Sequence, residues 1–167
     1  RLAEYFGATA EQEELLSTAA VPMDIVKRNG GAVLRIEQVI ADRYCAAILI
    51  DFTAPGGTVL DEDYYAFDEP VSATSKDGTE LQSRGFSWAV LKSDAENEKD
   101  NHTSILLSLY SLDGEFNFLG AEVELTLDGL YRDNLGEELV VPGRWNCTFT
   151  LPETDPGRLC TVNEPIG

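Results

Sequence analysis

The chain has 167 residues, of which 30 are acidic and 12 are basic, so its net charge is −18. This length suits one domain of ordinary size, and a hydrophobic fraction of 43% is enough to build a core. The negative field disfavours nucleic acid and anionic lipid surfaces as partners, and no apolar run reaches the roughly 18 residues that would span a membrane.

The first part of the chain predicts a short helix over residues 10–18. Helix formers dominate GATAEQEELLSTAA, and its acidic residues fall in the early turns, where they complement the helix dipole. Val21-Pro22 should end this helix. We therefore predict a helical or linker segment at residues 1–23 and a β domain at residues 24–167.

The stretch VLRIEQVIADRYCAAILIDF predicts two strands, residues 32–40 and 43–53. The tight connection Ala41-Asp42-Arg43 favours an antiparallel hairpin between them. Apolar residues occupy both faces of the second strand, so this strand should be central and covered on each side. The alternation in the first strand slips near Gln38, which indicates a β-bulge there.

Further strands are predicted at residues 70–75, 84–92, 103–112, 120–131 and 144–151, separated by turn sequences. The fold class is therefore all-β, an antiparallel β-sandwich of immunoglobulin-like type with about seven to nine strands and a short N-terminal helix. The alternation predicts these buried core residues: Leu34, Ile36, Ile48, Ile50, Phe52, Phe86, Trp88, Ile105, Leu107, Leu109, Val123, Leu125, Leu127, Trp145 and Phe149.

Catalytic signatures are scarce. His102 is the chain's one histidine, and its position at the start of a predicted strand is more typical of a surface residue. The sequence GFSWA resembles a nucleophile elbow but ends in Ala89, and Ser87 should be a solvent-facing strand residue. We predict no enzyme, no catalytic residues and no cofactor.

Acidic loops are the one abundant feature. The sequence DEDYYAFDE gathers Asp61, Asp63 and Asp68, which are weak candidates for a Ca²⁺ site, and DAENEKDN at 94–101 has similar acids without the required glycine. A solvated loop is the favoured interpretation for both, so no metal is predicted. NHT (101–103) and NCT (146–148) match the N-x-[ST] pattern for asparagine glycosylation, and two such matches in 167 residues are explained by chance.

The three cysteines have no metal-site spacing. Three free buried thiols are the favoured interpretation, and Cys147–Cys160 is the more favoured pair if one bridge forms.

The sequence AVLRIEQVIADRYCAAILIDFTAPGGTVLDEDYYAF resembles the first block of a domain-of-unknown-function family from Firmicutes. SILLSLYSL, GAEVELTLDGLY and RWNCTFTLP fit later parts of that family, and the resemblance covers residues 24–160. It implies a β-sandwich on the extracellular side of the cytoplasmic membrane, in single-span proteins that are anti-sigma-factor-like in some cases. The abrupt start at Arg1 suggests a tether through an upstream segment that is absent from this chain.

Three functional hypotheses follow. The leading one is a non-catalytic ectodomain that binds an unknown protein or cell-envelope ligand, or senses envelope conditions, with a possible link to anti-sigma regulation. The alternative is a carbohydrate-binding module, which requires exposed aromatic residues at Tyr64, Tyr65 or Trp88. The least favoured is a hydrolase that uses acids and His102.

Overall fold

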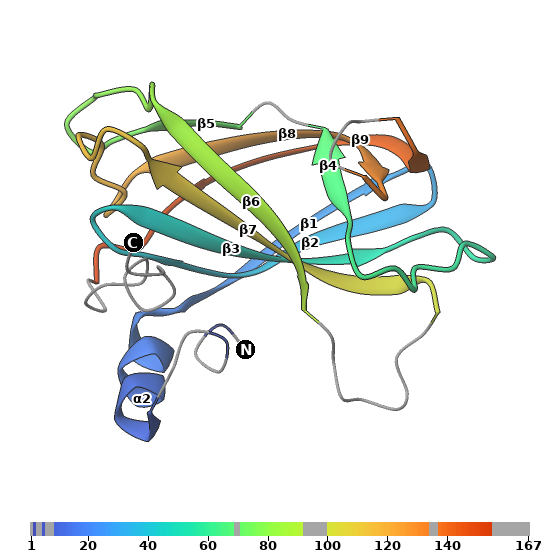
Figure 1. The fold of residues 1–167 in the computed structure, drawn as a ribbon, viewed down its shortest axis with the longest axis horizontal. Helices are drawn as coiled ribbons and strands as arrows, with labels where there is room; N and C mark the ends of the chain where they lie inside the picture. The colour runs from blue at the N-terminus through green and yellow to red at the C-terminus, as the bar shows by residue number, and fades with distance from the viewer. Residues whose placement is uncertain are drawn as a thin grey trace.

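The computed structural model describes residues 2, 5, 9–68, 71–91, 100–133 and 137–154, with the side chains of residues 12–16 left out of the description. This part of the chain forms one helix of ten residues and nine strands (Figure 1). The elements are α2 (Ala10–Ala19), β1 (Val21–Asn29), β2 (Ala32–Ala41), β3 (Cys45–Thr53), β4 (Ala66–Asp68), β5 (Val71–Thr74), β6 (Arg84–Leu91), β7 (His102–Ser111), β8 (Glu122–Tyr131) and β9 (Leu139–Thr150).

The strands form two antiparallel sheets. One has five strands in the order β1-β2-β3-β7-β6. In the other, β4 and β5 pair with successive parts of β8, and β9 pairs along the length of the same strand. Side chains from both sheets meet in one apolar core. The predicted all-β class, antiparallel pairing, strand number and N-terminal helix are therefore confirmed.

The predicted core residues are buried, with one exception. The rings of Phe52, Phe67 and Trp145 contact one another at centroid distances of 5.2–6.0 Å, in the middle of the shared core. Phe86 was predicted to be buried, but its side chain is 41% exposed. The prediction fails because β6 is an edge strand, so Phe86 has a neighbouring strand on one side only.

Strand β3 is central and covered on both faces, as predicted. Ile48, Ile50 and Phe52 face the shared core. Cys45, Ala47 and Leu49 face the opposite way and form a second, smaller apolar cluster. The side chains that complete this cluster come from the neighbouring strands and from the N-terminal segment: Ile40, Leu106, Leu2, Ala19 and Ala20.

The β2–β3 hairpin also has its predicted form. The register between the two strands shifts between Ile36 and Gln38, which confirms the expected bulge. Asp42 is buried in the turn, and its Oδ1 accepts the backbone N–H groups of Tyr44 at 2.7 Å and Cys45 at 2.8 Å. The Asp42 carboxylate therefore accepts two N–H groups for which the hairpin turn supplies no backbone acceptor.

The predictions missed two strands and began a third too late. No strand was predicted before residue 32, but β1 covers Val21–Asn29 and begins within the segment predicted to be helix or linker. Pro22 is tolerated there because β1 is an edge strand with a register shift. The short β4 was missed, since three residues leave almost no periodic signal. Strand β9 begins at Leu139, before the predicted start at residue 144, and continues through Pro142-Gly143.

The cysteine predictions are wrong. Cys45 is disulfide-bonded, so the chain does not carry three free thiols. Cys147 is free and buried in the shared core, where desolvation raises the pKa of its thiol, so it is not paired with Cys160. Cys160 itself lies outside the described residues. Alternation along β9 turns Cys147 inward, which is why closeness in sequence was a poor guide to pairing.

Candidate functional site

The weak metal candidates receive no support from the described part of the structure. Asp61, Asp63 and Asp68 are all exposed. Among the described residues, no group of three His, Cys, Asp or Glu side chains is arranged to hold a metal ion. Of the second acidic run, residues 94–99 lie outside the described part of the chain. Asn101 is described, and its side-chain amide donates to the Ala54 carbonyl at 2.7 Å, so it supports the loop.

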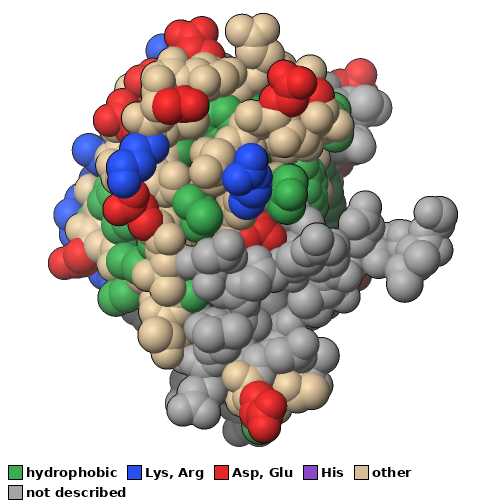
Figure 2. Space-filling view, turned by 90° about the vertical axis from the view of Figure 1, so that its left-hand side faces the viewer, with side chains coloured by type: hydrophobic (Ala, Val, Ile, Leu, Met, Phe, Trp, Pro, Cys, Tyr) green, Lys and Arg blue, Asp and Glu red, His purple; other side chains and the backbone are tan. Residues whose placement is uncertain are grey.

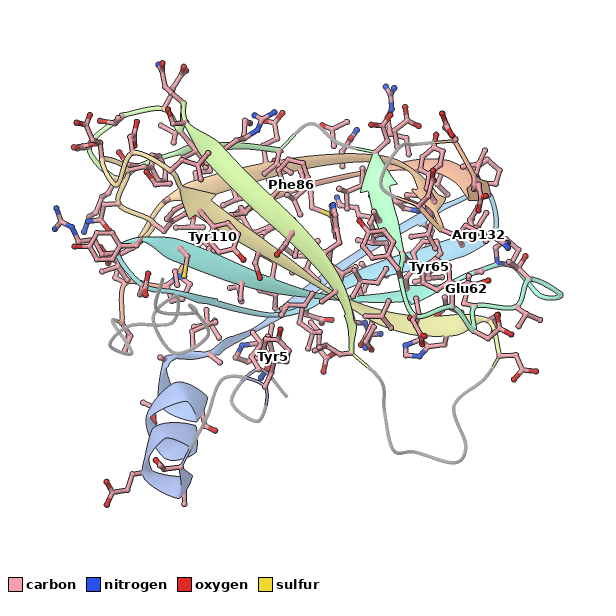
Figure 3. The ribbon with its side chains drawn as sticks, in the orientation of Figure 1. Tyr5, Glu62, Tyr65, Phe86, Tyr110 and Arg132 are labelled. Carbon is pink, nitrogen blue, oxygen red and sulfur yellow. The ribbon has the colours of Figure 1, made fainter. Side chains whose placement is uncertain are left out.

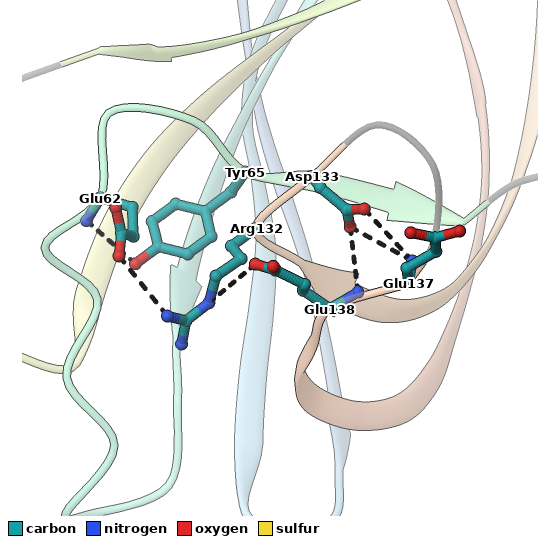
Figure 4. A network of polar contacts seen from close by, with 6 residues as sticks. All are labelled: Glu62, Tyr65, Arg132, Asp133, Glu137 and Glu138. Carbon is teal, nitrogen blue, oxygen red and sulfur yellow. Dashed lines mark hydrogen bonds and ion pairs between the residues drawn. The ribbon is translucent and has the colours of Figure 1, made fainter.

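The acidic loop around residue 62 is instead anchored to the β8–β9 connection (Figure 4). The buried Tyr65 hydroxyl accepts the N–H of Glu62 at 3.1 Å, and desolvation raises the pKa of this phenol. Arg132 lies between two acids, with its Nη1 3.6 Å from Glu62 Oε1 and its Nε 3.9 Å from Glu138 Oε2. Asp133 accepts the N–H groups of Glu138 and its neighbour in the same connection. This network connects the loop that carries Glu62 to the β8–β9 connection.

The aromatic residues that a carbohydrate platform would need pack inward. Tyr65 and Trp88 are buried, and Tyr64 is half-buried against the shared core. Figure 2 shows the end of the molecule that lies on the left in Figure 1. Where side chains are coloured by type in that view, charged and polar side chains divide the hydrophobic surface into small areas. The carbohydrate-binding hypothesis therefore loses the three residues on which it depended.

His102 lies at the start of β7 beside a carboxylate. Its Nε2 is 3.6 Å from Asp51 Oδ1, and the same Oδ1 accepts the hydroxyl of Ser104 at 2.7 Å. In a catalytic triad the histidine lies between the serine and the acid. Here the acid lies between the other two, and Ser104 is buried. These contacts support the β3–β7 ladder and do not have the order of a catalytic triad.

The two edges of the five-stranded sheet differ in a way that bears on binding. The β1 edge carries the features that prevent strand addition: Pro22, a register shift after it, and the charged residues Asp24, Lys27 and Arg28. Strand β9 of the other sheet also lies alongside β1. This edge is therefore closed to another strand.

The β6 edge has no proline and no register shift, and its one charged residue is Arg84 at the start of the strand. Strand β6 pairs with β7 in unbroken register from Arg84 to Leu91, and no described residue pairs with its other side. Between Gly85 and Leu91 it contains no charged residue and no proline. A regular, uncharged edge strand is a template on which an extended peptide can add.

The ladder geometry shows which backbone groups point to this edge. The N–H of Leu112 donates to the Ser83 carbonyl at 2.7 Å, just beyond the end of the β6–β7 pairing. Because hydrogen-bonded and non-hydrogen-bonded pairs alternate in an antiparallel ladder, the backbone groups of Phe86, Trp88 and Val90 point away from β7. These three residues would supply the hydrogen bonds to an added strand.

Side chains on both faces of β6 could contact such a strand. On the core side, Phe86 is exposed and Val90 is half-buried. On the other side, Ser87 is exposed, and its Oγ lies 3.1 Å from the Tyr110 hydroxyl. Figure 3 places Phe86 and Tyr110 away from the Glu62–Tyr65–Arg132 network. The candidate site is therefore the β6 edge, separate from the acidic loops.

Sequence reasoning identified the β6 strand but missed this site. It treated Phe86 as core, although the contrast between PMDIVKR in β1 and GFSWAVL in β6 was visible. An alternating strand without charges is the available signal. That signal becomes informative only when the strand is known to be at an edge.

Comparisons with known proteins identify the fold but no activity. No family model matches the chain, and no curated protein matches it. A solved structure described as the conserved domain protein from Bacillus anthracis is similar, with a TM-score of 0.61 and 12% sequence identity. The match covers 81% of this chain and 42% of that chain, so the present chain corresponds to less than half of that protein. No helix among the described residues is long and apolar enough to cross a membrane.

Proposed function

We propose that this chain is a non-catalytic binding domain that takes up an extended segment of another polypeptide along the free edge of β6. The observation that carries the proposal is the regular, uncharged edge from Gly85 to Leu91, with which no described residue pairs. In strand addition, main-chain hydrogen bonds give affinity, and contacts of alternate side chains give specificity. The outward backbone groups of Phe86, Trp88 and Val90 would supply the first, and the exposed Phe86 and Ser87 side chains the second.

The proposal includes an extracellular location, as the ectodomain of a membrane-anchored protein with a sensing or anti-sigma-linked role. The disulfide at Cys45 supports it, because disulfides persist mainly in oxidising compartments. The resemblance to the Firmicutes ectodomain family supports it independently. We also propose that the two sheets form a sandwich of immunoglobulin-like type, and their shared core is what favours this arrangement.

Phe86→Lys tests the binding surface, because an edge lysine is a natural block to strand addition. Val59→Lys is the matched control, since Val59 is an exposed apolar residue (52%) outside the strands. The wild-type chain should select extended peptides with alternating apolar residues from a random peptide library. Phe86→Lys should weaken these peptides at least about tenfold, and Val59→Lys by less than about twofold.

Hydrogen exchange gives a second measure of the same contact. A peptide bound at the β6 edge should slow exchange of the amide protons of Phe86, Trp88 and Val90. The proposal fails if selected peptides bind Phe86→Lys as well as they bind the wild-type chain, or if these three amides keep their exchange rates.

The location is tested on the full reading frame. A membrane-spanning segment should lie upstream of Arg1, and protease added to intact protoplasts should cut the domain. A full reading frame without any hydrophobic segment before Arg1 would remove the ectodomain part of the proposal and leave the binding site open to test.

A further inference from the structure

We infer that the segment which adds to β6 is the β6 strand of a second copy of this chain, so that the two copies form an antiparallel, two-fold symmetric pair. This inference rests on the proposed function, since it uses the same edge. Two-fold dimers are the commonest homo-oligomers, and they require a surface that is complementary to itself. The β6 edge meets that requirement in charge and in side-chain pattern.

Charge restricts where two copies can meet. Each copy carries a net charge of −18, so most approaches bring like charges together. Strand β6 is uncharged from Gly85 to Leu91, and its one charged residue is the cation Arg84. The edge is therefore a neutral strip on an acidic molecule. At the opposite edge of the same sheet, β1 offers no such approach because it carries Asp24, Lys27 and Arg28.

The side chains of β6 are also compatible with self-pairing. In an antiparallel pair centred on Ser87, the two Ser87 residues lie opposite each other, and Gly85 lies opposite Ala89 of the second copy. On the core side, Phe86 lies opposite Trp88, and Arg84 lies opposite Val90. Small residues then face small residues, aromatic residues face aromatic residues, and no charged residue faces another. The core faces of both copies stay on one side of the joined sheet, since residues that pair directly share a face.

The pair should be weak in solution. Pairing of a single strand of eight residues buries less than the roughly 1,000 Å² that stable interfaces exceed, and the net charges repel. Tethering to one membrane raises the local concentration of the copies, so a weak contact is sufficient there. Because salt screens the repulsion, the pair should become stronger with ionic strength, whereas a contact built on ion pairs becomes weaker.

Sedimentation equilibrium of the 167-residue chain from about 10 μM to about 1 mM tests the inference, at about 0.05 and about 0.5 M NaCl. The expected result is a reversible monomer–dimer equilibrium that tightens at the higher salt. Phe86→Lys should weaken dimerisation at least about tenfold, and Val59→Lys should change it by less than about twofold. Circular dichroism of both variants establishes that they are folded.

A cross-link supplies a second readout. Ser87 is exposed in β6, and a pair centred on it would place two Ser87→Cys side chains within reach of a disulfide. Oxidation should convert this variant to a covalent dimer. Asn146→Cys is the control, since Asn146 is exposed on β9 of the other sheet and should remain monomeric.

The possible results distinguish a failure of the dimer from a failure of the proposed binding site. A chain that stays monomeric throughout, or a dimer insensitive to Phe86→Lys, overturns the inference. If the chain is monomeric but Phe86→Lys still abolishes binding of selected peptides, the edge binds a different polypeptide and the proposed function stands. If Phe86→Lys affects neither measurement, both proposals fail.

Discussion

The Nη1 atom of Arg84 donates to the Val71 carbonyl at 2.8 Å, and this hydrogen bond links the edge strands of the two sheets. Arg84 begins β6 and Val71 begins β5, so the contact fixes the spacing of the sheets beside the candidate site. Further along β6, the Trp88 ring lies 5.6 Å from that of Phe67 in β4. Strand β6 is thus held by side chains against the second sheet, while no strand of the described part of the chain pairs with its outer backbone edge.

Arg84→Ala should therefore reduce stability. The variant leaves the Val71 carbonyl without its donor, and a hydrogen bond from an exposed cation of this kind contributes about 1 kcal/mol. Urea unfolding followed by tryptophan fluorescence measures the change. Arg144→Ala is the control, because its contact with Asp128 is an exposed ion pair that should contribute about 0.5 kcal/mol or less. Equal losses in the two variants would contradict the link between the sheets.

Asp42→Ala should be considerably more damaging than its position in a turn suggests. The substitution removes the acceptor of two backbone N–H groups next to the buried start of β3, which should cost about 2–3 kcal/mol. Asp42→Asn keeps a side-chain oxygen at the same position and should recover most of this loss. Chemical denaturation of the three proteins measures the order of stabilities. If Asn is as destabilising as Ala, the turn does not depend on these two hydrogen bonds.

Much of the architecture could be predicted from alternation alone. Ile48 and Ile50 faced one way and Leu49 the other, and this pattern correctly placed β3 between two apolar clusters. The even spacing of strands, together with their turn residues, gave the all-β class. Alternation gives faces but not neighbours, so it could not show that β6 is an edge strand or that Phe86 is exposed.

The disulfide and the candidate site depend on the same missing information. Pairing of Cys45 requires knowledge of which segments meet in space, and distance along the chain misled the prediction. The β6 strand is an edge strand because of its place in the sheet order. Sheet order depends on the whole fold and cannot be read from the sequence of one strand. Acids were misleading for a different reason. Asp42, Asp113 and Asp133 accept backbone N–H groups in turns, so part of the acidity is explained by local structure.

Stability should depend on the core and not on the acidic loops. Ile50→Ala removes a fully buried side chain from the shared core, and its expected cost is about 2–5 kcal/mol. Asp61→Ala changes an exposed loop residue, and its expected effect is within about 0.5 kcal/mol. The two are compared by denaturant unfolding in buffer with a chelator and in buffer with Ca²⁺. A costlier Asp61→Ala, or a gain on adding Ca²⁺, would indicate a structural metal.

The thiols should differ in reactivity. Cys147 is buried and burial raises the pKa of its thiol, so it should resist alkylation in the native chain and react after unfolding. Cys45 should stay unlabelled even in denaturant until a reductant is added, because it is disulfide-bonded. Mass mapping of labelled peptides, with and without reductant, distinguishes the two. Labelling of Cys45 in unreduced, unfolded protein would contradict the disulfide.

Two turn aspartates should make stability depend on pH in the acidic range. The Ser75 hydroxyl donates to Asp77, and the N–H of Glu115 donates to Asp113 at 3.0 Å, and these hydrogen bonds lower the pKa of each carboxyl in the folded chain. A folded-state pKa below the unfolded value of about 3.9 gives stability that is complete above that value. This contribution is lost as the pH falls through the lower, folded-state pKa.

The measurement is urea unfolding at about pH 7 and about pH 3 for the wild type and for a double variant, Asp77→Asn with Asp113→Asn. Neutral amides keep the turn geometry but do not titrate, so the double variant should lose less stability on acidification than the wild type. Asp61→Asn serves as the control, because Asp61 accepts no hydrogen bond from the described residues and its variant should follow the wild type. If the double variant loses as much stability as the wild type, the hydrogen bonds in the two turns do not lower the pKa of Asp77 and Asp113 in the folded chain.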